Sequence, residues 1–278
     1  MARRPIHGRA RSVSLVVVLL AVMVTAALPS SASAINGGYD VPAQSAQVSF
    51  TAAILADSGL NDGDPSAPWG PDGAGPGEPG GGVRLLCGAT LVNRSWVLTA
   101  KHCVQGGLVV RLDSVNSLSG GALHRVVATE PYPDHDGIAV DAALLKIDPP
   151  APSNGIELAS PAELPMGQAV GLLGWGMSAP DSGTSPVLRQ VDIQVVGGEA
   201  CGGLRPAEIC LADPANPNAS ACFGDSGGPA VIRRGEAYVL AGVASQAGGT
   251  APTCSGATVY VGVPSVSDWV MSVTSAQK

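Results

Sequence analysis

The sequence predicts an all-β protein, built either as a sandwich or as barrels, with a single α-helix near its end. Glycine and proline are abundant, with 37 and 23 residues in a chain of 278. They divide the chain into many short segments rich in β-branched residues, a pattern that favours short strands joined by turns. The period changes at 265–274, where Val266, Trp269, Val270 and Val273 repeat at helical spacing.

Residues 1–34 have the features of a secretory signal peptide. A basic start containing Arg3 and Arg4 precedes an apolar stretch at 13–28, and the small-residue sequence Ala32-Ser33-Ala34 follows it. The stretch is short for a helix that must cross about 30 Å of hydrocarbon, so we favour a cleaved signal over a membrane anchor. We therefore expect a secreted protein that leaves the membrane after cleavage.

Two segments of the remaining chain do not resemble strands. Residues 57–82 are rich in glycine, proline and aspartate and predict a surface insertion with little to bury. A proline-rich stretch at 148–165 indicates a linker between two halves, 35–150 and 151–278. The strands expected in these halves are 47–55, 87–92, 96–99, 108–112, 125–130, 142–147, 168–174, 188–196, 230–233, 238–244 and 258–263.

The cysteines are consistent with export. All six lie after the signal peptide, and an even number in an oxidising compartment predicts three disulfides. A zinc site is the alternative, but the sequence has no Cys-x-x-Cys pair. Six cysteines allow 15 pairings, so spacing alone leaves the connectivity open. The six are Cys87, Cys103, Cys201, Cys210, Cys222 and Cys254.

The segment Gly224-Asp225-Ser226-Gly227-Gly228-Pro229 is the strongest indication of chemistry. A serine hydroxyl is a poor nucleophile at neutral pH unless a base is beside it, and its reactions need N–H donors aimed at the developing oxyanion. Glycines on both sides allow a tight bend and a close approach of substrate. A glycine-rich turn with an incidental serine is the alternative for this segment taken alone.

A base and a carboxylate precede the serine in the chain. His102 follows an apolar strand and is adjacent to Cys103, which could hold its loop in place. Asp141 opens another apolar strand, so we expect its carboxylate to be nearly buried and to need a partner. A histidine N–H would satisfy it and would hold the imidazole in the tautomer that serves as a base. Asp134 and Asp136 lie in a polar turn, where solvation is expected.

These segments, in this order, resemble the chymotrypsin/trypsin-like serine proteases over 35–278. The serine segment resembles the family's Gly-Asp-Ser-Gly-Gly-Pro, and the segment ending in His102 resembles Leu-Thr-Ala-Ala-His-Cys, with Lys101 replacing an alanine. Asp141 begins a segment similar to Asp-Ile-Ala-Leu-Leu, and 174–176 resembles a Gly-Trp-Gly of the second barrel. The order His, Asp, Ser also agrees with the family. The alanine- and glycine-rich, lysine-poor composition is typical of a bacterium with a GC-rich genome.

The resemblance implies two six-stranded antiparallel β-barrels with an active site between them and a terminal helix. The first barrel (35–150) would contribute His102 and Asp141, and the second (151–278) would contribute Ser226. It implies a serine endopeptidase that forms an acyl-enzyme, with the N–H groups of Gly224 and Ser226 as oxyanion donors and with no cofactor or metal. The disulfides implied are Cys87–Cys103, Cys201–Cys210 and Cys222–Cys254.

The resemblance also implies a mode of activation. Ile35-Asn36-Gly37-Gly38 resembles the family's Ile-Val-Gly-Gly start, whose α-ammonium pairs with the aspartate before the serine, here Asp225. Such a buried ion pair acts more as a switch than as a stabiliser. Cleavage after Ala34 would expose Ile35 directly, so export itself would produce the active form. Asn36 departs from the small apolar residue usual at its position.

The specificity pocket is expected to be uncharged. By similarity its base is Ser220, six residues before the nucleophile, where an aspartate would attract Arg or Lys side chains. Its walls by similarity are Ser245, Gln246, Ala247 and the stretch containing Thr258, whose side chain would narrow the pocket. We therefore expect preference for small or medium uncharged side chains.

Charge and motif order limit the other functions. A net charge of −7 argues against nucleic acid as a partner and leaves protein or peptide substrates and proteinaceous inhibitors as the expected ones, for a monomer. An inactive homologue used for binding is one rival, supported by Lys101 and Asn36. A lectin-like sandwich would need three ordered matches by chance. An esterase with a Gly-x-Ser-x-Gly elbow would have the order Ser, Asp, His, which this chain contradicts.

Overall fold

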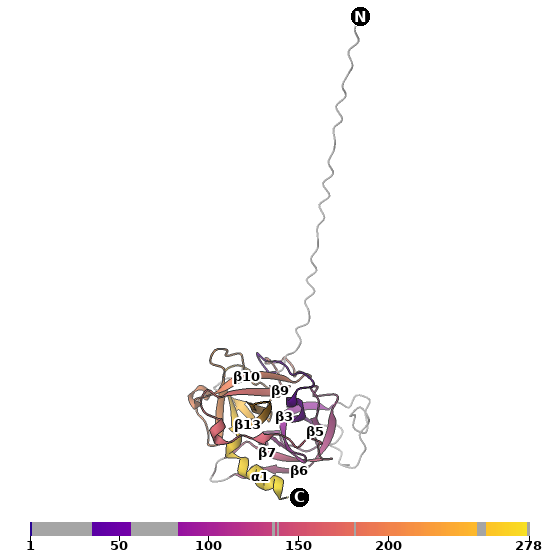
Figure 1. Ribbon diagram of the computed structural model, residues 1–278, viewed down its shortest axis with the longest axis vertical. Coiled ribbons are helices and arrows are strands. Elements are labelled where there is room, and N and C mark those ends of the chain that lie inside the picture. The colour runs from indigo at the N-terminus through magenta and orange to yellow at the C-terminus, as the bar shows by residue number, and fades with distance from the viewer. Residues whose placement is uncertain are drawn as a thin grey trace. The chain divides into compact units, whose positions relative to one another are not determined.

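The computed structural model describes most of the chain that follows the predicted signal peptide (Figure 1). The predicted signal peptide, apart from Met1, and the predicted insertion 57–82 lie outside the described residues. The described residues are 1, 35–56, 83–134, 137, 139–180, 182–248 and 254–276.

Six strands of the first half close into an antiparallel barrel. Every pair of neighbouring strands in the ring is antiparallel. The strand that precedes His102, β4, lies between β3 and β7. The buried side chains of these strands are mainly aliphatic and include Trp96. In ring order the strands are β2 (Thr51–Ala56), β3 (Arg84–Asn93), β4 (Trp96–Thr99), β7 (Ala143–Asp148), β6 (Ala122–Pro131) and β5 (Leu108–Leu112).

Six strands of the second half close in the same way, which confirms the predicted pair of barrels. The ring closes because β9 pairs with both β10 and β12. Two short strands pair with it from outside, β1 (Tyr39–Asp40) with β10 and β8 (Glu157–Leu158) with β13. In ring order the six are β9 (Ala169–Gly174), β10 (Arg189–Val196), β11 (Glu208–Ala212), β14 (Thr258–Gly262), β13 (Ala237–Ala247) and β12 (Pro229–Arg234).

Two sequence predictions of strands need correction. The first half of 47–55 is a 3₁₀ turn, Ala46–Ser49, in which the Thr51 hydroxyl donates to the carbonyl of Gln47 at 2.7 Å, and the strand starts only at Thr51. No strand was predicted at β11, whose few apolar residues lie between prolines. Its extended form depends on neighbours on both sides, β10 and β14, which a local pattern cannot reveal.

The two ends of the described chain cross over between the barrels. The predicted terminal helix is confirmed as α1 (Ser267–Ser275; Figure 1). Its Trp269 packs edge to face on Tyr132 of the first half, with ring centroids 5.1 Å apart. At the other end, β1 pairs with β10, and Ile35 is buried in the core of the second barrel. Each half of the molecule is therefore contacted by a terminal segment from the other half of the sequence.

Glycines bring the barrels into backbone contact where they meet. A Cβ on Gly88 of β3 would lie 2.7 Å from the Cα of Gly228, and the Gly88 N–H donates to the Ser226 carbonyl at 2.7 Å. A continuous hydrophobic cluster also joins the first barrel to Trp175 and Val243 of the second. The serine segment is thus seated directly against the first barrel.

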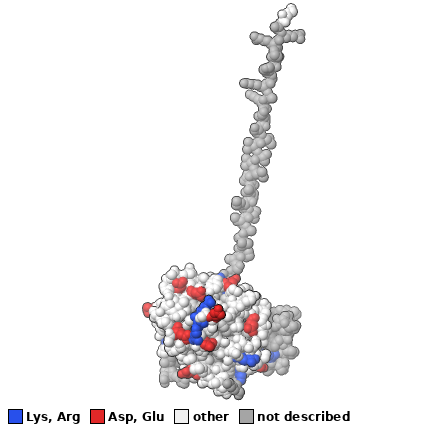
Figure 2. All heavy atoms as spheres, in the orientation of Figure 1, with Lys and Arg blue, Asp and Glu red and all other residues white. Residues whose placement is uncertain are grey.

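Three disulfides are present, with the pairings that the resemblance implied: Cys87–Cys103, Cys201–Cys210 and Cys222–Cys254. On the face shown in Figure 2, a short central stripe of basic side chains is flanked by acidic side chains, and further basic side chains lie toward the rim. Arg234 forms ion pairs with Glu157 and Glu163. Within the described residues, no helix has both the length and the apolar character needed to cross a bilayer.

Candidate active site

His102 lies in a short 3₁₀ turn, Lys101–Cys103, directly after β4. The disulfide from Cys103 to Cys87 ties this turn to β3. The backbone N–H of His102 donates to Oδ1 of Asp141 at 3.0 Å, and the imidazole Nδ1 lies 2.8 Å from Oδ2 of the same carboxylate. The first contact holds the carboxylate against the histidine backbone, the second orients the ring, and Nε2 is left as the nitrogen that can accept a proton.

Asp141 lies just before β7 and is held by donors from both barrels. In addition to His102, the hydroxyl of Ser245 on β13 donates to Oδ2 at 2.6 Å. Burial alone would raise the pKa of Asp141, but hydrogen bonds from the His102 ring, Ser245 and the His102 N–H outweigh it and lower that pKa. Asp141 is therefore ionised at neutral pH. Sequence reasoning assigned Ser245 to the pocket wall and missed this contact.

The carboxylate in turn changes the titration of the imidazole. The hydrogen bond to Asp141 raises the pKa of His102 above its usual value of 6.5, with a further contribution from the carboxylate charge. Partial burial of the ring opposes the shift but does not cancel it. The side chain of His102 is 47% exposed, so a substrate can reach it.

Ser226 occupies a tight bend between Asp225 and β12. Gly227 has φ +75°, and a Cβ there would lie 2.1 Å from Oγ1 of Thr99. The Ser226 carbonyl is bonded to Gly88, the residue after Cys87, so the serine bend and the histidine turn share one support. Among the described residues, no hydrogen bond joins the Ser226 hydroxyl to His102. In unliganded enzymes this contact is commonly long and tightens when substrate binds.

The predicted oxyanion donors are the N–H groups of Gly224 and Ser226. Neither donates to an acceptor within the part of the chain that the structure describes. Gly224 has φ +91°, and a Cβ there would lie 3.1 Å from Cα of Gly176, so only glycine fits this bend. Both donors are therefore available to a ligand.

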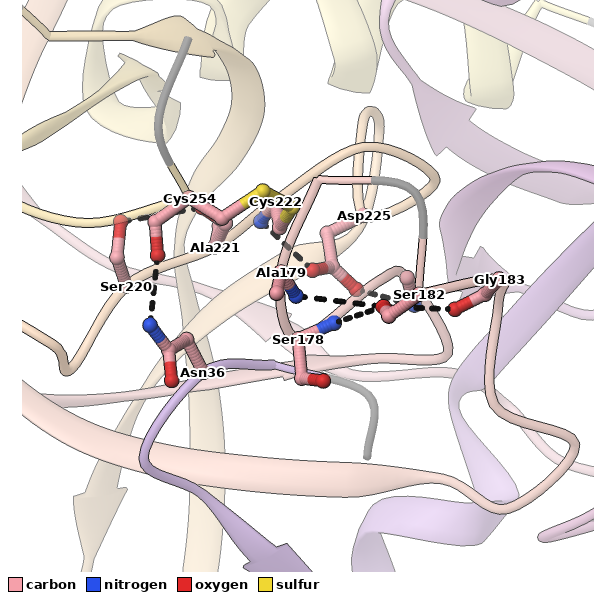
Figure 3. Close-up of a disulfide and its surroundings, with 11 residues drawn as sticks. Asn36, Ser178, Ala179, Ser182, Gly183, Ser220, Ala221, Cys222, Asp225 and Cys254 are labelled. Carbon is pink, nitrogen blue, oxygen red and sulfur yellow. Dashed lines mark hydrogen bonds between the residues drawn. A yellow bond between two sulfur atoms is a disulfide. The ribbon is translucent and has the colours of Figure 1, made fainter. Parts of the chain in front are cut away.

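Asp225 is completely buried beneath this bend (Figure 3). Its carboxylate accepts the N–H of Gly176 at 2.7 Å and that of Cys222 at 2.9 Å. Burial raises its pKa to about 7, and the two N–H donors only partly oppose the shift. Gly174 and Gly176 permit the approach, since a Cβ on either would lie 2.0 to 2.5 Å from the carboxylate. This crowding explains the Gly-Trp-Gly segment.

Ile35, the predicted partner of Asp225, is fully buried in the second barrel. In the full chain its nitrogen is part of the peptide bond to Ala34, so it carries no α-ammonium. Asn36 forms a β-bridge with Ser220, and its side-chain amide donates to the carbonyl of Cys254 at 2.9 Å (Figure 3). The start of the predicted mature chain is thus already seated near the serine segment.

A cavity of about 270 Å³ opens beside Ser226. Ser245, Gln246, Ala247 and Thr258 line it, as the resemblance implied, but Ser220 does not. Ser220 is buried and pairs through its backbone with Asn36, and its neighbour Ala221 is among the residues that line the cavity. The remaining lining residues are Cys222, Phe223, Ala244 and Cys254.

The described residues offer few ligands for a metal ion. Within the described residues, the one cluster of potential ligands is Cys87, His102 and Cys103. The two sulfurs are bonded to each other, so the cluster offers only an imidazole that Asp141 already binds.

Comparison with known proteins agrees with this arrangement. The family described as Trypsin matches residues 75–270. A serine protease, SP24D, of Anopheles gambiae is 35% identical over 54% of this chain and 60% of that protein. Trypsin 5G1 of Aedes aegypti is 32% identical over 70% of this chain and 77% of its own length. Human granzyme M is 33% identical over 68% of this chain and 79% of its own length.

A family match over most of the chain therefore coincides with two closed barrels, a His–Asp pair and a serine bend bonded to the first barrel. The chain belongs to the trypsin family of serine endopeptidases.

Proposed function

We propose that this chain is an active, secreted endopeptidase in which Ser226 attacks the substrate carbonyl and His102 is the general base. The observation that carries the proposal is the contact of 2.8 Å between His102 Nδ1 and an ionised Asp141. This contact fixes the imidazole tautomer whose Nε2 can take a proton from a hydroxyl. An inactive binding homologue has no need of it.

The residues suggest a two-step reaction. When a substrate carbonyl enters beside Ser226, Oγ bonds to the carbonyl carbon and its proton passes to His102 Nε2. The carbonyl oxygen becomes an oxyanion that the N–H groups of Gly224 and Ser226 can stabilise. His102 then gives its proton to the leaving amine as the C–N bond breaks, which leaves an acyl-enzyme. Water repeats the sequence and releases the acid.

The cavity beside Ser226 supports a preference for small or medium uncharged side chains. None of its lining residues is charged among those described, so a buried Arg or Lys side chain would find no counter-ion. Thr258 is 4% exposed and its hydroxyl donates to the Gln246 carbonyl at 3.3 Å, which holds the side chain in the wall. A large aromatic side chain of a substrate would collide with the Thr258 side chain.

Activation by exposure of Ile35 fits the state of Asp225. Within the described residues this buried carboxylate accepts two N–H groups and forms no ion pair, and burial raises its pKa to about 7. An α-ammonium at Ile35 would supply the missing charge and would favour the ionised form. We propose that cleavage after Ala34 creates this pair and orders the bend at 224–226. Protein or peptide substrates and proteinaceous inhibitors are the partners proposed for a secreted monomer.

Reaction with a fluorophosphonate probe tests the nucleophile. We expect the protein that begins at Ile35 to be labelled on Ser226, and Ser226→Ala to lose labelling and about 10⁶-fold in kcat. Ser272→Ala, which removes a hydroxyl from α1, is the matched control and is expected to retain both. An unlabelled but folded wild-type protein would support the inactive homologue instead.

The acid limb of the pH profile tests the base. His102 must be neutral to accept a proton, and its pKa is raised by Asp141. We therefore expect kcat/KM for an uncharged peptide to rise with pH through a midpoint above 6.5. Asp141→Asn removes the cause of the shift and is expected to lower kcat about 10⁴-fold. A wild-type midpoint below that of free histidine would contradict this assignment.

A panel of chromogenic peptides tests the pocket. We expect the highest kcat/KM after alanine, valine or leucine, and little cleavage after arginine. Thr258→Gly is expected to raise cleavage after phenylalanine, relative to alanine, by about 10-fold or more. Thr258→Val keeps the volume and removes the hydroxyl, so it is expected to leave the preference unchanged. Strongest cleavage after arginine would overturn the proposed preference.

The pH dependence of stability tests the switch. In the unprocessed chain Asp225 titrates near 7 instead of 3.8, so its contribution to the free energy of unfolding is full below about pH 4 and is lost as pH rises through 7. We expect the form that begins at Ile35 to gain stability over the unprocessed form across this range, and to be the active one. Denaturant unfolding of both forms measures the difference. An equally active unprocessed form would disprove the switch.

A further inference from the structure

A buried arginine holds one loop of the first barrel. Arg111 on β5 is 6% exposed, and its guanidinium donates to three carbonyls of the loop 113–121. Nε donates to Ser117 at 3.1 Å, one terminal nitrogen to Leu118 at 3.3 Å and the other to Gly120. No carboxylate forms an ion pair with Arg111 within the described part of the chain. Its donors are thus directed at one loop.

The loop 113–121 is also organised from within. The Asn116 side chain accepts the N–H groups of Leu118 and Ser119 at 2.9 and 3.0 Å. The hydroxyl of Ser114 donates to the Ser119 carbonyl at 2.7 Å and accepts the N–H of Asn116. With the N–H groups of Asn116, Leu118 and Ser119 satisfied within the loop, three of its carbonyls accept from the guanidinium, whose planar fork matches several acceptors at once.

The same loop contacts the second barrel. The carbonyl of Val115 accepts two hydrogen bonds from it, from Trp175 Nε1 at 2.8 Å and from the Leu188 N–H at 2.7 Å. Asn116 bridges to Val187, and the N–H of Ser117 donates to Pro186 at 2.9 Å. The loop held by Arg111 is therefore a structured contact between the two halves of the molecule.

Trp175 carries this contact to the serine bend. The residue after it, Gly176, donates its N–H to Asp225 at 2.7 Å, and Asp225 is adjacent to Ser226. A Cβ on Gly224 would lie 3.1 Å from Cα of Gly176, so the bend that carries the oxyanion donors packs against Gly176 as well. A displacement of Trp175 therefore moves Asp225 and both oxyanion donors together.

We propose that Arg111 is a positioning residue for the oxyanion donors, acting through Val115 and Trp175. This inference rests on the proposed function, since it assigns a role within that reaction. The guanidinium fixes the loop 113–121, the Val115 carbonyl fixes the indole of Trp175, and Gly176 fixes Asp225 and the bend that follows. Arg111 touches neither substrate nor the reacting atoms.

Four variants test the proposal: Arg111→Lys, Arg111→Met, Trp175→Phe and the double variant Arg111→Met/Trp175→Phe. Trp175→Phe removes the indole N–H and keeps an aromatic ring. Misplaced oxyanion donors weaken only the binding of the transition state. We therefore expect kcat per titrated active site to fall about 10- to 100-fold in these variants, with KM nearly unchanged. The double variant is expected to lose no more than the worse single variant. Arg84→Met, at the exposed start of β3, is the control and is expected to keep wild-type kcat.

The outcomes separate positioning from stability. A lower melting temperature with wild-type kcat per active site would overturn the proposal, because it shows a structural role alone. Losses that multiply in the double variant would overturn the path through Trp175. If Arg111→Met does not fold, Arg111→Lys and Trp175→Phe decide by the same kcat measurement. Failure of the wild-type protein to react with the fluorophosphonate probe would instead reject the proposed function.

Discussion

The carboxylate of Asp141 is the point on which the arrangement of the site depends. It is partly buried, and burial opposes its charge, so it needs donors. Those donors come from both barrels, since His102 belongs to the first and Ser245 to the second. The docking of the barrels thereby adds the Ser245 donor to those of His102, and the ionised carboxylate orients the imidazole.

Close packing of backbone against backbone makes this docking possible. Gly88 and Gly228 face each other where any side chain would collide, and the hydrogen bond from Gly88 to Ser226 forms across the gap. The disulfide between Cys87 and Cys103 then links the residue before Gly88 to the turn that carries His102. Nucleophile and base are held by one small group of contacts, although they are 124 positions apart in the sequence.

The two carboxylates of the site differ in their state. Asp141 accepts hydrogen bonds from two side chains, His102 and Ser245, and its pKa is lowered. Among the described residues, Asp225 accepts hydrogen bonds only from backbone N–H groups, and burial raises its pKa to about 7. A carboxylate in this second state is sensitive to the arrival of a positive charge. The glycines of the Gly-Trp-Gly segment bring the chain close enough to make Asp225 part of the serine bend.

The sequence alone determined the short strands, the terminal helix and the residue types of the site, because strand periodicity, turn residues and a nucleophile flanked by glycines are local properties. The tertiary structure alone decided that β11 is a strand, since its extended form depends on β10 and β14. It also decided that Ser245 donates to Asp141 and that Ala221 faces the cavity in place of Ser220. Ser245 and Asp141 are 104 residues apart, and Ser220 forms a β-bridge with Asn36. Such contacts form only when the barrels close and dock. They join residues far apart in the sequence, so no local sequence pattern predicts them.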